Sequence, residues 1–272
     1  VNIMDYKFKK ILIGFDNSAA AVIALNKALH TCKIFKTSLY VINVKDPKSA
    51  ESGYGINIQQ EADKFGVPIQ YMEKRGHVSR EIHATEKEIK ADLIFMGAHG
   101  LNGFQPYWIG SNAIRVVSAS TCPVITVQAD AAETDFTNIV LPLDNSVETR
   151  QKVPYAAVFA KAFGATIHVL SVSKDKSAET HNRIQIYGKQ TMTYLEEREI
   201  KCTFDLKQGK SVAQTCIDYG IEKKAGLIMM MTETESNSWF MGTAAQQLVN
   251  HSPIPVMSIH SRDLYLAGES GY

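Results

Sequence analysis

Short apolar runs alternate with longer amphipathic segments along the whole chain. In the first half the runs span residues 10–15, 38–44, 68–73, 92–96 and 123–127, and they are continuous rather than alternating. Continuous runs rich in Ile, Leu and Val are typical of strands buried on both faces of a parallel sheet. The segments between them have helical periodicity, with Ser79 and Ser211 as expected helix caps. The pattern predicts an α/β fold whose right-handed crossovers place helices on both faces of an open parallel sheet.

The second half of the chain repeats the first. At a constant offset of 128 residues, both copies have an apolar run, the triplet Asp-Asn-Ser, a helical segment and a second apolar run that ends in valine. The triplets are residues 16–18 and 144–146, and the valines are Val44 and Val172. Such a duplication predicts two tandem five-stranded domains at residues 6–128 and 136–260, with a polar linker between them and a flexible tail at 261–272.

Composition and charge exclude several classes of protein. The chain has 272 residues, of which 45% are hydrophobic and 21% charged, and its net charge of +1 gives no general attraction to nucleic acid or anionic lipid. No apolar run reaches 18 residues, and the first run indicates a strand rather than a secretory signal. The four cysteines and eight histidines are dispersed, which predicts reduced thiols and no metal site. We therefore expect a cytoplasmic protein that binds neither nucleic acid nor membrane.

Three segments of the first half come at the carboxyl ends of predicted strands, where open parallel sheets bind ligands. The first is Asp16, Asn17 and Ser18, and the second is Val44. The third runs from Met96 to Asn112 and contains the most informative spacing of the chain. An acid at the end of a first strand can accept hydrogen bonds from ribose hydroxyls.

The third segment has glycines at both ends and leads into a helix. Gly97 and Gly100 follow the strand, nine residues intervene, and Gly110, Ser111 and Asn112 open the helix. Glycines allow close approach of an anion, and the free N–H groups of a helix start attract phosphate. The segment therefore predicts a nucleotide pocket, although the same spacing is also found in simple turns before a capped helix.

These motifs together resemble the universal stress protein family, in particular a tandem two-domain member of its ATP-binding branch. The resemblance rests on the opening ILIGFDNS, the pattern G-x2-G-x9-G-S after ADLIFM, and the closing CPVITV, and it covers residues 8–128 and 137–260. It implies a Rossmann-like fold of the adenine nucleotide alpha hydrolase type in each half. It also implies that Asp16 and Val44 contact the nucleoside and that Gly97, Gly100, Gly110, Ser111 and Asn112 hold the phosphates.

The glycine loop departs from the family pattern in its charge. Where members commonly have basic residues, this chain has Leu101 and Gln105, so ATP is the expected ligand but ADP or AMP remain open, with or without Mg²⁺. His99 adds charge if it is protonated, and it is otherwise a neutral loop residue.

The second half keeps Asp144 and Val172 but loses the glycine loop. Met231 stands where the first half has Gly97, and Glu233 and Glu235 bring negative charge to the loop. We interpret this half as a structural partner, and a metal held by the two glutamates is the alternative.

The leading hypothesis is a stress-response protein in which nucleotide occupancy of the first domain acts as a sensor or regulator. The alternative is a scaffold that binds no nucleotide and docks onto another protein. No catalytic residue is identified, because the chain lacks the signatures of nucleotide-transferring enzymes, so at most slow ATP hydrolysis is expected. A phospho-receiver is disfavoured, since no acid closes a third strand.

Assembly is expected to follow from the last strand of each half. The resemblance implies that residues 123–127 and 255–259 pair within the chain. A further homodimer and the identity of any protein partner stay open.

Overall fold

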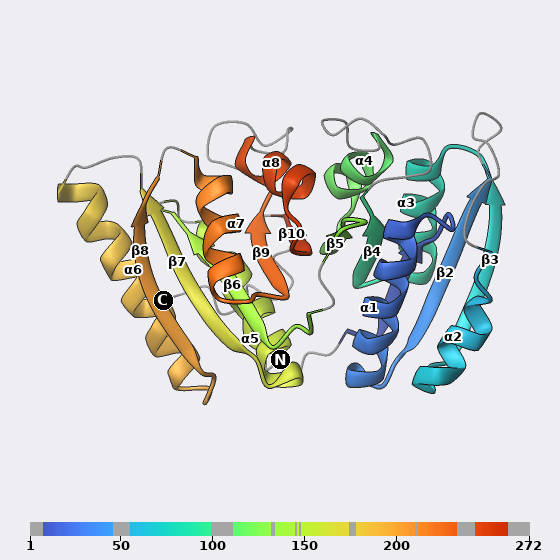
Figure 1. Cartoon of the computed structure of the whole chain (residues 1–272), viewed down its shortest axis with the longest axis horizontal. Helices are drawn as coiled ribbons and strands as arrows, with labels where there is room; N and C mark the ends of the chain where they lie inside the picture. The colour runs from blue at the N-terminus through green and yellow to red at the C-terminus, as the bar shows by residue number, and fades with distance from the viewer. Residues whose placement is uncertain are drawn as a thin grey trace. The chain divides into compact units, whose positions relative to one another are not determined.

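The chain divides into two compact units, with the boundary between residues 131 and 132 (Figure 1). The computed structural model describes residues 8–45, 55–98, 111–131, 134–144, 146, 148–173, 178–209, 211–232 and 243–260. We call residues 8–131 the N-terminal unit and residues 134–260 the C-terminal unit. Each unit is an open, fully parallel five-stranded sheet with helices on both faces, which confirms the fold class predicted from the sequence.

The N-terminal unit has the strand order β3-β2-β1-β4-β5. Helices α1 and α2 contact each other on one face of this sheet, and α3 and α4 contact each other on the other face. This division follows from right-handed crossovers that run first in one direction along the sheet and then in the opposite direction. In chain order the elements are β1 (Lys10–Gly14), α1 (Ala19–Phe35), β2 (Ser38–Lys45), α2 (Ile58–Phe65), β3 (Ile69–Arg75), α3 (Val78–Ile89), β4 (Leu93–Gly97), α4 (Ser111–Ala119) and β5 (Val124–Val127).

The C-terminal unit repeats this arrangement with the order β8-β7-β6-β9-β10. One difference is that a 3-10 helix, η2, precedes the first α-helix of this unit. The elements are β6 (Asn138–Leu143), η2 (Glu148–Lys152), α5 (Val153–Phe163), β7 (Thr166–Ser173), α6 (Ala178–Glu196), β8 (Cys202–Gln208), α7 (Val212–Glu222), β9 (Leu227–Met231), α8 (Thr243–His251) and β10 (Val256–Ile259).

Strand register confirms the internal repeat residue by residue. Ile11 pairs with Leu93 in the N-terminal unit, and Ile139 pairs with Leu227 in the C-terminal unit. Towards the other edge of each sheet, Val44 pairs with Lys74 and Val172 pairs with Lys207. The two halves can therefore be compared position by position.

The core lies along the central strands, and the edge strand departs from the expected burial. Ile11, Leu12 and Ile13 of β1 are fully buried. In β3, by contrast, the side chains are exposed or half-buried, and Tyr71 is 51% exposed. The prediction that the run at 68–73 is buried on both faces is therefore wrong, because an edge strand has a neighbour on one side only.

The two expected helix caps have different outcomes. Ser211 caps α7, where its hydroxyl oxygen accepts a hydrogen bond of 3.3 Å from the backbone N–H of Gln214. Ser79 does not cap α3, because the helix begins one residue earlier and His77 occupies the cap position. Among the described residues, no helix combines the length and apolar character that crossing a membrane requires.

Candidate functional site

The carboxyl ends of β1 and β4 meet where the direction of the chain across the sheet reverses. The chain crosses from β1 to β2 on one side, whereas β4 lies on the other side of β1, with Gly14 paired to Met96. Open α/β sheets bind ligands outside the carboxyl ends of the strands at such a switch point. The predicted site residues that the structure describes lie at or near this edge.

The triplet after β1 forms a tight turn that leads into α1. Asp16 is exposed, and its Oδ1 accepts a hydrogen bond of 3.0 Å from the backbone N–H of Ser18. Asn17 adopts the left-handed conformation, with φ of 59°. Ser18 is buried and caps α1, since its Oγ accepts a bond of 3.2 Å from the N–H of Ala21. The turn thus presents the Asp16 carboxylate at the sheet edge and commits the Ser18 oxygen to the helix.

The end of β2 is tied to the end of β1 by a residue that sequence reasoning missed. The side-chain amide of Asn43 donates a hydrogen bond of 2.9 Å to the carbonyl oxygen of Phe15. Val44, the next residue, is half-buried near the end of β2. The only signal in the sequence is one polar residue inside the apolar run YVINV. Asn43 therefore fixes Val44 relative to the turn that contains Asp16.

Gly97 ends β4 directly against the first turn of α1. A Cβ atom at this position would lie 2.7 Å from the backbone nitrogen of Ala21 and 3.0 Å from the carbonyl carbon of Ala20. Such distances are too short for any side chain, so the glycine is required for α1 to start where it does. Gly97 and the Asp16 turn are thereby brought together at the switch point.

Helix α4 begins close to the predicted position, and part of the loop before it lies outside the described residues. Ser111 is the first residue of the helix, and Asn112 is half-buried. Among the predicted site residues, His99, Gly100 and Gly110 lie outside the described residues. Helix α4 follows β4 in the chain, so its N–H groups begin at the carboxyl side of the sheet.

The equivalent end of β6 in the C-terminal unit has different contacts. Asp144 Oδ1 accepts hydrogen bonds of 2.8 Å from the N–H of Ser146 and 2.6 Å from its hydroxyl. Ser146 therefore donates to the acid, and Thr149 Oγ1 accepts a bond of 3.1 Å from the N–H of Asp144. Met231 stands at the position of Gly97 and is buried.

A buried lysine lies beside this turn. Lys152 is 1% exposed, and its Nζ donates to the carbonyl oxygen of Thr149 at 2.6 Å and to its hydroxyl at 3.1 Å. Burial lowers the pKa of Lys152 to about 8, while Asp144 and Cys216 oppose the shift. Burial likewise raises the pKa of the Cys216 thiol to about 12. The C-terminal unit thus has its own cationic side chain where the N-terminal unit has Ala24.

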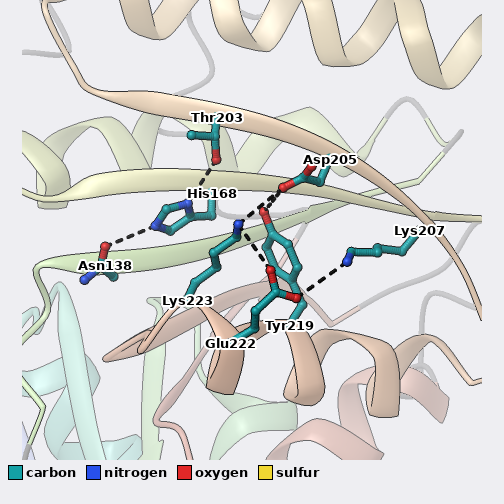
Figure 2. A network of polar contacts seen from close by, with 8 residues as sticks. All are labelled: Asn138, His168, Thr203, Asp205, Lys207, Tyr219, Glu222 and Lys223. Atoms are coloured by element: carbon teal, nitrogen blue, oxygen red, sulfur yellow. Dashed lines mark hydrogen bonds and ion pairs between the residues drawn. The ribbon is translucent and has the colours of Figure 1, made fainter.

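A polar network joins three strands of the C-terminal unit to α7 (Figure 2). His168 Nδ1 lies 2.9 Å from Thr203 Oγ1 and its Nε2 lies 3.1 Å from Asn138 Oδ1. The Tyr219 hydroxyl donates a bond of 2.6 Å to Asp205, and the carboxylate of Asp205 also lies 3.7 Å from Lys223 Nζ.

The surroundings shift two pKa values within this network. Burial, together with the nearby charge of Lys223, lowers the pKa of His168 against the opposing effect of Asp205. Burial and the hydrogen bond to Asp205 raise the pKa of Tyr219. His168 is the third residue of β7, so this network lies away from the carboxyl ends of the strands.

The described residues offer no metal centre. Among them, no group of three or more His, Cys, Asp or Glu side chains is arranged to hold a metal ion. Glu233 and Glu235, the suggested metal ligands of the second half, lie outside the described residues.

Comparisons with known proteins agree with the duplicated architecture. The sequence model of the universal stress protein family matches this chain twice, at residues 55–128 and 135–260. A universal stress protein of Methanocaldococcus jannaschii is 29% identical over 145 residues, which are 46% of this chain and 85% of that protein. The universal stress protein YxiE of Bacillus subtilis is 26% identical over 147 residues, 44% of this chain and 99% of that protein.

A solved structure covers both halves together. The crystal structure of a universal stress protein from Archaeoglobus fulgidus superimposes with a TM-score of 0.75 at 17% identity, covering 94% of this chain and 100% of that one. At this identity the similarity shows the fold alone.

Proposed function

Because this chain belongs to the universal stress protein family, we propose that its N-terminal unit binds an adenine nucleotide, with ATP as the first ligand to test. The observation that carries the proposal is the meeting of the Asp16 turn, Gly97 and the carboxyl end of β4 at the switch point of the sheet. In this proposal nucleotide occupancy acts as a sensor or regulator in a stress response.

Each residue of the site has a distinct role in the proposal. The exposed carboxylate of Asp16 accepts hydrogen bonds from the ribose hydroxyls, and Val44 contacts the nucleoside. The phosphates approach the glycine segment and the N–H groups at the start of α4, with Ser111 and Asn112 as further donors. Asn17 lies in the turn, and Ser18 acts through α1, because its oxygen is already bonded to the helix.

The charge of the site sets the order of affinities among adenine nucleotides. Leu101 and Gln105 contribute no positive charge, so the phosphates depend on backbone N–H groups and on His99 when it is protonated. Each added phosphate then gains little, and we expect AMP and ADP to bind almost as well as ATP. Mg²⁺ would help ATP most, because it neutralises part of the triphosphate charge.

The C-terminal unit is proposed to bind no adenine nucleotide. Met231 fills the position of Gly97, and the first turn of an α-helix is replaced by η2. The pairing of residues 123–127 with residues 255–259 stays a prediction.

The identical triplets of the two halves provide a matched test. Isothermal titration of the full chain with ATP, ADP and AMP, with and without Mg²⁺, should give one site per chain. Asp16→Asn should weaken binding roughly 10- to 100-fold, the effect of losing hydrogen bonds to a charged acceptor, and Asp144→Asn should leave it unchanged. Equal loss in both variants would place the site elsewhere, and no binding to wild type at millimolar nucleotide would favour the scaffold alternative. Turnover measured over hours tests for slow hydrolysis.

A further inference from the structure

A buried carboxylate on α3 holds the turn between α4 and β5. Glu86 is 1% exposed, and its Oε1 accepts hydrogen bonds of 2.7 Å from the N–H of Thr121, 2.8 Å from the Thr121 hydroxyl and 3.1 Å from the N–H of Cys122. Its Oε2 lies 3.0 Å from Nδ1 of His83, one turn earlier on the same helix. Both oxygens of the carboxylate are therefore engaged.

Burial of the Glu86 carboxylate is stabilising only when its hydrogen-bond donors are all in place, which indicates that the contact has a specific structural role. Burying a carboxylate without partners is strongly unfavourable, whereas several N–H and O–H donors stabilise it. The donors belong to residues 121–122, which follow α4 after the single residue Ser120. The backbone N–H of Ser120 donates a helical hydrogen bond of 2.9 Å to the carbonyl oxygen of Val116. Glu86 thus joins α3 to the turn that follows α4, at a residue 35 positions away in the chain.

The C-terminal unit holds the same turn without a charge. When the two units are aligned by strand register and helix starts, Gly220 of α7 is the equivalent of Glu86, and Ile254 is the equivalent of Cys122. A Cβ at Gly220 would lie 2.5 Å from Cδ1 of Ile254. The isoleucine side chain therefore occupies the space that a side chain at position 220 would take. The carboxylate occurs in the unit that keeps the glycine motif, and an apolar contact replaces it in the unit that has lost the motif.

Helix α4 connects the two ends of this arrangement. It has nine residues and a length of about 14 Å at 1.5 Å per residue, so its two ends are joined by an unbroken set of intrahelical hydrogen bonds. Its first residues belong to the proposed phosphate site, and the residues just after its end are held by Glu86. We propose that Glu86 is a positioning residue that fixes α4 and thereby sets the affinity of the N-terminal unit for nucleotide phosphates. This inference rests on the function proposed above.

The test compares a variant that removes the carboxylate with one that keeps its shape. Glu86→Ala loses every acceptor, whereas the Oε1 of Glu86→Gln still accepts from Thr121 and Cys122. Ile82→Val, at a fully buried position on the same helix, controls for general loosening of α3. Hydrogen exchange of residues 111–123 and titration with ATP are measured for all four proteins.

We expect Glu86→Ala to accelerate exchange selectively in residues 111–123 and to weaken ATP binding roughly 2- to 30-fold, the usual range for residues that act through another element. Glu86→Gln should restore both properties close to wild type, and Ile82→Val should change neither selectively. Unchanged ATP affinity in Glu86→Ala, or equal acceleration throughout the unit, would overturn the proposal.

The experiment also covers a Glu86→Ala variant that does not fold and a wild type that binds no nucleotide. If Glu86→Ala does not fold, Thr121→Val removes one donor from an exposed residue, and it should accelerate exchange in the same segment to a smaller extent. If the wild type binds no nucleotide, the proposed function fails. The exchange data then test by themselves whether Glu86 positions α4. Unaltered exchange of residues 111–123 in Glu86→Ala would refute the positioning role.

Discussion

The ends of β1 and β6 carry the same three residues and yet start different structures. After β1, Ser18 caps α1, which begins at Ala19. After β6, Ser146 donates to Asp144, a 3-10 helix follows, and the α-helix begins only at Val153. At the offset of 128 residues, Val153 corresponds to Leu25, so the α-helix starts six residues later in the second copy. An identical local sequence therefore does not fix where a helix begins.

The cause lies on another strand. Gly97 has no side chain, and the first turn of α1 occupies the space that a Cβ would take. Met231 has a buried side chain at the equivalent position, and η2 contacts the strand β9 that carries it. We infer that the volume of one residue at the end of the neighbouring strand controls whether the Asp-Asn-Ser turn leads directly into an α-helix.

The two units also differ in what their buried positions contain. Lys152 and the His168 network of Figure 2 belong to the C-terminal unit, where the N-terminal unit has Ala24 and Tyr40 at the positions of Lys152 and His168. The N-terminal unit has its own buried charge, Glu86, where the other has Gly220. After duplication, each copy has kept the sheet and acquired different polar contacts around it.

The largest effect on stability is expected when the methionine of the C-terminal unit, Met231, is introduced at the equivalent position of the N-terminal unit, Gly97. Gly97→Met should destabilise the N-terminal unit by roughly 3 kcal/mol, because overpacking forces α1 away from the sheet edge. It should also abolish the proposed nucleotide binding. Urea unfolding combined with hydrogen exchange of residues 8–35 measures the change. Met231→Leu, a swap of similar volume, is the control and should cost less than about 1.5 kcal/mol. A stable Gly97→Met variant with protected α1 would refute the explanation.

Lys152 should give the C-terminal unit a distinctive dependence on pH. Its folded pKa of about 8 lies below the ordinary value of 10.5, so the folded state loses the proton at lower pH than the unfolded chain does. Between these values the unfolded chain binds more protons, and the free energy of unfolding should rise with pH by up to about 3 kcal/mol.

Lys152→Met should remove this rise, as judged by urea unfolding at pH 7, 8, 9 and 10 in comparison with wild type. Lys161→Met, at an exposed position on α5, should keep it. Parallel pH profiles of the wild type and Lys152→Met would contradict the lowered pKa.

The smallest expected effect is the difference in stability between alanine variants of Ser18 and Ser146. Ser18→Ala should cost about 1 kcal/mol, because α1 loses its capping acceptor. Ser146→Ala should change stability by no more than about 0.5 kcal/mol, since Ser146 caps no α-helix. Thermal and urea unfolding of both variants measure the difference. Similar losses would mean that the two triplets are equivalent after all.

Much of the fold could be predicted from the sequence, because apolar runs and their order are local properties. The predicted strands at 10–15, 38–44, 92–96 and 123–127 match β1, β2, β4 and β5 closely. The burial of the run at 68–73 was predicted wrongly, since no local pattern says that a strand lies at an edge. The cap at Ser79 was also wrong, because His77 precedes the first helical residue.

The candidate site was predictable in outline only. Asp16 and Gly97 could be selected because strand ends and glycine spacing are visible in the sequence. Asn43 and Glu86 could not, since a single amide in a strand or a single glutamate in an amphipathic helix is ordinarily a surface residue. Their partners, Phe15 and Thr121, are distant in the sequence.

By itself the sequence determined that this protein consists of two copies of one α/β unit, because the repeated order of apolar runs specifies the same strands and crossovers twice. The tertiary structure alone decided which Asp-Asn-Ser triplet caps a helix, which lysine is buried and which glutamate bonds to the turn after α4. Those outcomes depend on the volume and hydrogen bonding of side chains brought together from distant segments, and such contacts exist only once the chain has folded.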